Sequence, residues 1–191
     1  MTHDELDDEH WLLLHEVRLR GVVNVDGSVA VRVQEAGLVV RVPKGIRLTP
    51  DGRERHTAWA RVEPETELEL AVERAYQRFL ALNRELIRVC SDWQVRPGGV
   101  PNDHHDPTYD WAIVDRVDAI DDRVSPIIAG LSRLVTRFAD YRPRLRAARR
   151  RVDDGEAEWL TSPRIDSYHT VWMQLHEDLL LALGRERSSE K

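Results

Sequence analysis

The sequence predicts a mainly α-helical protein with two domains, residues 1–62 and residues 63–191. In the first part, two β-branched-rich segments, LVVRV and IRL, flank the breaker Pro43-Lys44-Gly45, a pattern that indicates a β-hairpin. In the second part, apolar residues recur at alternating spacings of four and three, which is the period of an amphipathic helix. A small domain with a short hairpin followed by a helical bundle accounts for both patterns.

Composition places the chain among globular cytoplasmic proteins. Its 191 residues are 41% hydrophobic and 32% charged, enough to bury a core and too polar for a membrane protein. No apolar run approaches the roughly 18 residues that a membrane helix needs. The acidic start MTHDELDDEH is unlike a targeting peptide, and the single cysteine, Cys90, leaves no internal disulfide. We expect Cys90 to be inert packing on an apolar helix face.

The charge distribution is uneven. The formal net charge is −6, yet the segment from Val17 to Arg61 holds nine basic and four acidic residues, a local balance of +5. Such asymmetry can steer a polyanion to one face of an acidic protein. The alternative is an ordinary solvated surface.

Four elements are expected in the N-terminal domain. Residues 5–20 form a first helix that Gly21 ends, and a short helix follows with Ser28 as N-cap and Gly37 as C-cap. The hairpin comes next. Thr49 then caps a helix with Pro50 at its first position, running to about Arg61.

This order, together with EAGLVVR before the turn and LTPDGR after it, resembles winged-helix transcriptional regulators of the MarR/PadR type over residues 5–62. The resemblance implies that the short helix enters the major groove of double-stranded DNA and that basic wing residues meet phosphates. Carried over residue by residue, the implied DNA-binding residues are Ser28, Arg32 and Gln34 on the helix and Arg41, Lys44 and Arg47 on the wing.

The sequence departs from that family in one place. Only seven residues separate Arg20 from Ser28, which leaves little room for the usual second helix, so the helix-turn-helix is abbreviated. The short helix is also rich in valine, which cannot read bases by hydrogen bonds. The leading interpretation is a transcriptional regulator, and the second is an adaptor that binds a protein partner through a degenerate winged helix.

The bundle is expected to begin with a long helix from Glu65, whose apolar stripe from Leu68 to Trp93 also predicts a homodimer interface. A second helix should stop at Ser125-Pro126, and a third should follow. Further helices are expected after Pro143 and from about Arg164 to Leu183. Three segments of the bundle resemble an uncharacterised helical region of bacterial proteins near phosphoenolpyruvate- and pyruvate-handling enzymes. They are FLALNRELIRVCSDWQ, NDHHDPTYDW and DSYHTVWMQLHEDLL. Such an enzyme is a candidate partner for the adaptor.

Polar and aromatic residues gather in two segments of the bundle, a loop at 102–110 and the last helix at 166–176. If the segments meet, they form an effector pocket with aromatic walls. The alternatives are a structural network of buried polar groups and a site for a metal, whose identity the sequence leaves unknown. The candidate ligand-binding residues are His104, His105, Asp106, Tyr109, Asp166, His169, Trp172 and His176.

A dense basic run from Arg142 to Arg151 either pairs with the acidic residues Asp153, Asp154, Glu156 and Glu158 as a solvated face, or binds phosphate or nucleic acid. No phosphate-binding loop, nucleophile elbow or H-E-x-x-H motif occurs, so we do not expect an enzyme. A metal- or ligand-dependent enzyme built on the His and Asp residues is the third interpretation.

Overall fold

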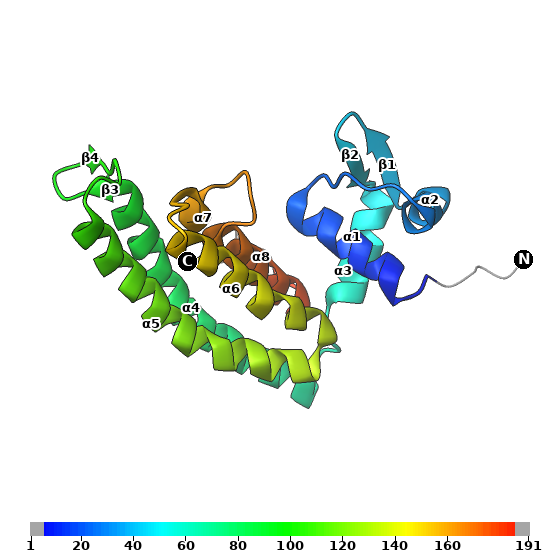
Figure 1. The fold of residues 1–191 in the computed structure, drawn as a ribbon. Coiled ribbons are helices and arrows are strands. Elements are labelled where there is room, and N and C mark those ends of the chain that lie inside the picture. Colours follow the sequence, from blue (N-terminus) through cyan, green and yellow to red (C-terminus); the bar gives the residue numbers. More distant parts are fainter. Residues whose placement is uncertain (1–5, 186–191) are drawn as a thin grey trace, which may run out of the picture. The chain divides into compact units, whose positions relative to one another are not determined.

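The computed structural model describes residues 6–185, which are mainly helical, with two small two-stranded antiparallel sheets (Figure 1). The chain divides into two compact units. Unit 1 comprises Met1–Glu65 and Glu177–Lys191, and unit 2 comprises Thr66–His176. The sequence predicts a boundary after Val62 and a single domain from there on, whereas this division groups the residues from Glu177 onward with the N-terminal part.

Unit 1 begins with helices and a hairpin in the order α1 Asp8–Arg20, α2 Ser28–Glu35, β1 Val39–Val42, β2 Gly45–Leu48 and α3 Pro50–Ala60. The caps explain two of the boundaries. The Asp7 carboxylate accepts from the N–H groups of Glu9 and His10 at the start of α1. The Thr49 hydroxyl accepts from the Gly52 N–H at 3.0 Å, and Pro50 follows it as predicted. At α2, Gly27 rather than Ser28 is the N-cap, so that detail of the prediction was wrong.

The hairpin pairs Val39 with Leu48 and Val42 with Gly45, and a third segment joins it. Val23 and Ile46 exchange two backbone hydrogen bonds of 3.1 and 2.8 Å, which attach the chain between α1 and α2 to β2. The core beneath this sheet is apolar. Its least exposed side chains come from α1, α2 and the hairpin and are Leu14, Val33, Leu38 and Ile46.

Gly52 lets α3 lie directly against the backbone that enters the hairpin. A Cβ atom at this position would stand 1.9 Å from the carbonyl oxygen of Leu38, far inside van der Waals contact. Gly52 is buried in the first turn of α3. Its missing side chain therefore sets how closely α3 and the hairpin approach.

The last helix, α8 Tyr168–Ala182, supplies residues to both units, because those from Glu177 onward count with unit 1. There the Val62 N–H donates to the Ala182 carbonyl at 2.9 Å, and Arg18 pairs with Glu177 at 3.1 Å. The helix begins at Tyr168 rather than at the predicted Arg164. The reason is local, since the Ser167 hydroxyl accepts from the Thr170 N–H and caps the first turn.

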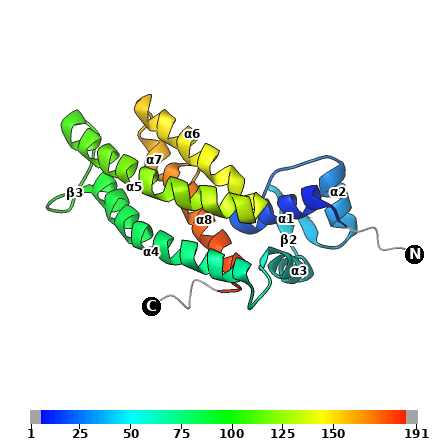
Figure 2. The same cartoon turned by 90° about the horizontal axis from the view of Figure 1, so that it is seen from below.

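Unit 2 consists of two long helices, a small hairpin between them and shorter helices. α4 and α5 run side by side, as Figure 2 shows. In chain order the elements are α4 Glu67–Gln94, β3 Val95–Arg96, β4 Val100–Pro101, α5 Pro107–Leu134, the 3₁₀ turn η1 Thr136–Asp140, α6 Tyr141–Asp153, α7 Glu158–Thr161 and the first part of α8.

The predicted break at Ser125-Pro126 was wrong, because α5 continues through Pro126 as one helix. Proline removes a single backbone donor and clashes with the preceding turn, which costs about 3 kcal/mol or more in a helix interior. The flanking residues Val124, Ile127 and Ile128 are all buried, so burial holds both halves of the helix in line.

The predicted apolar stripe of α4 is buried within the chain itself. Phe79 stacks on Trp172 with ring centroids 4.8 Å apart, and the Trp172 indole donates to Asn83 at 2.9 Å. Cys90 lies in the same interior, where burial raises the pKa of its thiol to about 12. Within the described part of the chain, none of the helices is both long enough and apolar enough to cross a membrane.

Replacing Gly52 by alanine is expected to destabilise the protein by about 1–3 kcal/mol or more, because the new methyl group meets a backbone carbonyl that cannot rotate away. The matched control is Gly130→Ala in α5, where a Cβ meets nothing within 4 Å. That change should stabilise by about 0.5–1 kcal/mol. Urea unfolding followed by circular dichroism measures both, and a Gly52→Ala variant as stable as the natural chain would contradict the close approach.

Candidate functional site

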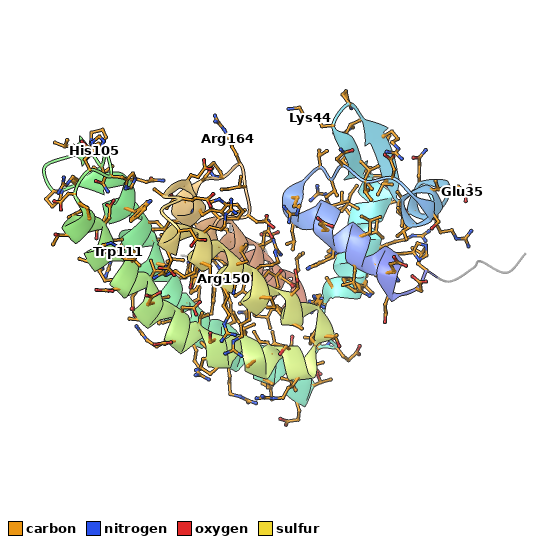
Figure 3. The ribbon with its side chains drawn as sticks, in the orientation of Figure 1. Glu35, Lys44, His105, Trp111, Arg150 and Arg164 are labelled. Carbon is orange, nitrogen blue, oxygen red and sulfur yellow. The ribbon has the colours of Figure 1, made fainter. Side chains whose placement is uncertain are left out.

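The three candidate DNA-reading residues lie on α2, a helix of eight residues in unit 1. Ser28 and Gln34 are exposed, and Arg32 is half-buried. Val31 and Glu35 occupy the same exposed part of the helix, and Figure 3 labels Glu35 at its end. The face therefore offers few donors for base edges and includes one carboxylate.

The three candidate wing residues differ in their partners. Arg41 donates to the Val25 carbonyl at 3.1 Å and pairs with Asp26 at 3.0 Å, so its guanidinium is engaged inside unit 1. Lys44 lies at the tip of the hairpin (Figure 3), and Arg47 lies on β2. Both are exposed, and neither has an ion-pair partner among residues 6–185.

A groove of about 590 Å³ lies between β2 and the start of α3. Arg47 lines it from the strand and Arg53 from the helix, together with Glu54 and Thr57. Arg53 is exposed and also lacks an ion-pair partner within the described residues. Arg53 belongs to the basic segment of the sequence but was not among the predicted site residues. Its place four residues after Thr49, at the start of a helix next to the wing, is the signal that could have identified it.

The candidate loop residues of unit 2 hold one another and the start of α5. The Asp106 carboxylate caps α5 by accepting from the Tyr109 N–H at 3.2 Å, and it pairs with Arg96 at 2.6 Å. These two contacts, the backbone one first, lower the pKa of Asp106. The Tyr109 hydroxyl donates to the Asp92 carbonyl at 2.9 Å, while Arg96 stacks over the Tyr109 ring.

His104 has a defined tautomer. Its Nδ1 atom lies 3.0 Å from an Asp110 oxygen, and the Asn102 amide nitrogen is 3.2 Å away. That amide already donates to the Trp93 carbonyl and to the other Asp110 oxygen, at 3.1 and 2.8 Å. Both amide protons are thus in use, so Nδ1 of His104 donates to Asp110, which leaves Nε2 as an acceptor when the ring is neutral.

This imidazole borders a small pocket of about 180 Å³. Trp93 packs against His104 with ring centroids 4.5 Å apart, and Trp111, which is 48% exposed, forms another wall. Figure 3 shows Trp111 on α5 and His105 in the loop. His105 is 87% exposed and contacts Asp103, so it takes no part in the pocket.

The four candidate residues near α8 lie elsewhere in unit 2. Asp166 pairs with Arg144 at 3.2 Å. His169 is half-buried, and burial lowers the pKa of its ring. Trp172 and His176 belong to the core, where His176 packs on Phe79 with ring centroids 5.3 Å apart.

The structure does not bring the loop and α8 together as one site. The hydrogen bonds, ion pairs and ring contacts of His104, His105, Asp106 and Tyr109 are all made within residues 92–110. Within residues 6–185, no group of three or more His, Cys, Asp or Glu side chains is arranged to hold a metal ion. The loop cluster and the core cluster are therefore separate.

Sequence reasoning missed a buried polar cluster in unit 1. The Nδ1 atom of His15 lies 3.0 Å from Nε2 of His56, and Nε2 of His15 lies 3.1 Å from an oxygen of Asp178. The three residues are 6%, 0% and 0% exposed. The available signal was that His15 lies four residues after Trp11 and so shares the apolar face of α1. In the structure Trp11 stacks on Trp59, with ring centroids 5.7 Å apart.

One proton at most can lie between the two imidazoles. The 3.0 Å contact between the rings is a hydrogen bond in which His15 either accepts from His56 or donates to it. The Asp178 carboxylate lies 3.1 Å from the His15 ring, so its buried charge has an imidazole beside it. The cluster is thus a structural link between α1, α3 and the end of α8 within unit 1.

Comparison of the chain with protein-family models, with curated proteins and with solved structures found no match. The functional assignment therefore rests on the chain's own residues and their geometry.

Asp178→Ala is expected to reduce the free energy of unfolding by about 1–3 kcal/mol, because it removes the buried carboxylate that lies beside the His15 ring. Glu177→Ala is the control on the neighbouring position. Its pair with Arg18 is partly exposed, so its loss should cost less than about 1 kcal/mol. Urea denaturation of both variants checks this, and equal losses would show that the buried pair adds nothing specific.

His169 is expected to titrate below 6.5, the usual value for histidine, because burial disfavours its charged form. As the pH falls, the His169 ring therefore takes up its proton at a higher pH in the unfolded chain than in the folded chain. The contribution to stability is complete above about pH 6.5 and is lost as the pH falls from there towards the folded-state pKa. Proton NMR of the ring gives the midpoint, and a midpoint above 6.5 would contradict the expectation.

Proposed function

We propose that this protein is a DNA-binding transcriptional regulator that docks through unit 1. The observation that carries the proposal is a set of exposed cations, Lys44, Arg47 and Arg53, which have no acidic partner among residues 6–185. They lie together on the hairpin and at the start of α3, in a chain of net charge −6. Unpaired cations at a protruding hairpin suit a phosphate backbone.

The order of elements in unit 1 supports the same proposal. A helix, a short extended segment bridged to β2, a second helix, a hairpin and a third helix follow one another, which is the order of a winged helix except that no helix lies between Arg20 and Ser28. In this proposal α2 is the recognition helix and the β1–β2 hairpin is the wing. The buried contact of Gly52 with the Leu38 backbone holds α3 against the wing.

The composition of α2 suggests low sequence specificity. Its eight residues span about 12 Å, and its exposed polar side chains are few. Arg41 is held by Asp26 and is less available to phosphate than the sequence suggested. Phosphate contacts therefore dominate the proposed binding, and base reading falls to Ser28, Arg32 and Gln34.

A homodimer remains part of the proposal, because paired recognition helices read paired half-sites. The α4 stripe expected to form its interface is already buried within the chain, at Val72, Phe79, Leu86 and others. A dimer would therefore use other surfaces. The His104 pocket is the proposed effector site of the second unit, with Nε2 as its hydrogen-bond acceptor and Trp93 and Trp111 as its walls.

A second candidate function is a protein-binding adaptor, and one observation favours it. Three valines of unit 1, Val22, Val31 and Val40, are 39%, 50% and 42% exposed. Exposed apolar residues in a small domain suit a protein partner more than a phosphate backbone. Binding of this kind would depend little on salt.

Replacing Lys44, Arg47 and Arg53 together by alanine is expected to weaken binding to every DNA duplex alike. Each lost phosphate contact flattens the dependence of log K on log salt by about 0.9, so the slope should fall by up to about 2.7. Fluorescence anisotropy with a labelled duplex at several salt concentrations measures affinity and slope together.

The matched control removes three exposed arginines of α4, Arg74, Arg78 and Arg84, by exchange for alanine. It makes the same change in net charge and should leave the slope unchanged. Equal effects of the two triple variants would show that only total charge matters. Absence of salt-dependent binding by the natural chain would reject DNA binding, and capture of a protein partner that Val31→Asp abolishes would establish the adaptor.

A further inference from the structure

The six arginines of α6 fall into two sets, and the first set is paired. Arg149 makes a bidentate contact with Asp118 at 2.6 and 2.8 Å and a third bond to Asp153. Arg144 bonds Asp166, Asp140 and Gln174, and Arg151 pairs with Glu156 at 2.6 Å. Of the four acidic residues predicted to neutralise the run, Asp153 and Glu156 do so, whereas the carboxylate partners of Arg144 lie elsewhere.

The second set is Arg142, Arg146 and Arg150, each four residues after the last. This spacing places them in one row on the helix, about 6 Å apart along its axis. None of them has an ion-pair partner within residues 6–185. Like charges at this spacing repel one another, so the row costs stability in the absence of a bound anion.

The row lines a groove of about 460 Å³ between α6 and α5. Ile128 and Ala129 of α5, Ala139 of η1 and Pro143 form its apolar part. None of the lining residues is acidic, so nothing in the groove neutralises the three guanidinium groups. Arg150 lies on α6 in Figure 3.

Two hydrogen-bonding groups in the groove indicate which kind of ligand it binds. The Nε atom of Arg142 is buried and has no acceptor in the described part of the chain. The Ser132 hydroxyl already donates to the Ala129 carbonyl at 3.1 Å, so the guanidinium groups are the main donors. A buried donor without an acceptor favours a ligand that supplies one.

We propose that this groove binds a small molecule that carries a phosphate or pyrophosphate group. Guanidinium groups form paired hydrogen bonds with phosphate oxygens, and three of them in a row match a group with several anionic oxygens. The remainder of the ligand lies on Ile128, Ala139 and Pro143. The groove volume is within the range of small-molecule sites, about 300–1,000 Å³. The site is separate from the His104 pocket and does not depend on DNA binding.

A small ligand fits better than a nucleic acid. The three cations span only about 12 Å and line a concave surface. A DNA duplex is wide, so its phosphates are contacted by cations on protruding surfaces rather than inside a small groove. The groove also has an apolar floor, which a phosphate backbone would leave uncovered.

Isothermal titration calorimetry of the full chain with pyrophosphate and with ADP tests the proposal. One site per chain is expected. The groove variant, Arg142→Gln with Arg146→Gln and Arg150→Gln, should lose about a hundredfold or more in affinity, since each charge-assisted bond contributes on the order of tenfold.

The control variant carries Arg116→Gln, Arg123→Gln and Arg151→Gln, which remove the same charge from exposed, paired arginines of unit 2. It should bind both ligands within about threefold of the natural chain, because exposed pairs contribute little. The variant lacking Lys44, Arg47 and Arg53 should also bind normally, which separates this test from that of DNA binding. Circular dichroism confirms folding, and the single variants Arg146→Gln and Arg150→Gln replace the triple variant if it does not fold.

Three results would overturn the proposal. The first is no binding of either ligand by the natural chain, and the second is an equal loss in the groove and control variants. The third is binding of succinate as tightly as pyrophosphate, which would show a general anion site. Loss of duplex binding in the groove variant, without binding of small phosphates, would instead assign the row to nucleic acid.

Discussion

Burial of the Asp178 carboxylate is the constraint on which unit 1 depends. A carboxylate that is 0% exposed needs a partner, and His15 supplies it at 3.1 Å while bonding His56 on its other side. Three segments far apart in the chain, in α1, α3 and the end of α8, thereby occupy fixed places. The hydrogen bond from Val62 to Ala182 and the pair between Arg18 and Glu177 reinforce the same arrangement. The hairpin and α2 are built on this framework, so their exposed residues are presented by a rigid support.

The distribution of ion pairs separates structural cations from available ones. In unit 2, Arg149 and Arg144 connect α6 to α5 and to the residues before α8, and their carboxylate partners neutralise them. The cations that remain unpaired in the described residues include Lys44 and Arg47 on the hairpin and the row on α6. Both proposals about ligands follow from this difference. A cation that already has a carboxylate gains little from a phosphate, whereas an unpaired one gains a charge-assisted bond.

Aromatic and histidine side chains have different roles in two parts of unit 2 despite similar residue types. Trp172 and His176 are core residues: the Trp172 indole donates to Asn83, and the His176 ring packs on Phe79. His104 lies at the protein surface beside a pocket, and the use of both Asn102 amide protons leaves its Nε2 atom as an acceptor. The difference arises from the neighbours, because an imidazole enclosed in the core is structural, whereas one that borders a pocket is available to a ligand.

Local signals in the sequence determined most of the helices and both hairpin strands, because caps and periodicity act within a few residues. Thr49 with Pro50 marked the start of α3, and the four-three spacing from Leu68 to Trp93 marked α4. Tertiary structure decided the rest. Packing of Val124 and Ile127 carried α5 through Pro126, where local chemistry predicted a break. The pairing of His15 with Asp178, and the separation of the loop at His104 from the core at His176, depend on contacts between residues dozens of positions apart. Such contacts leave no periodic pattern, so only the folded chain shows which titratable groups meet.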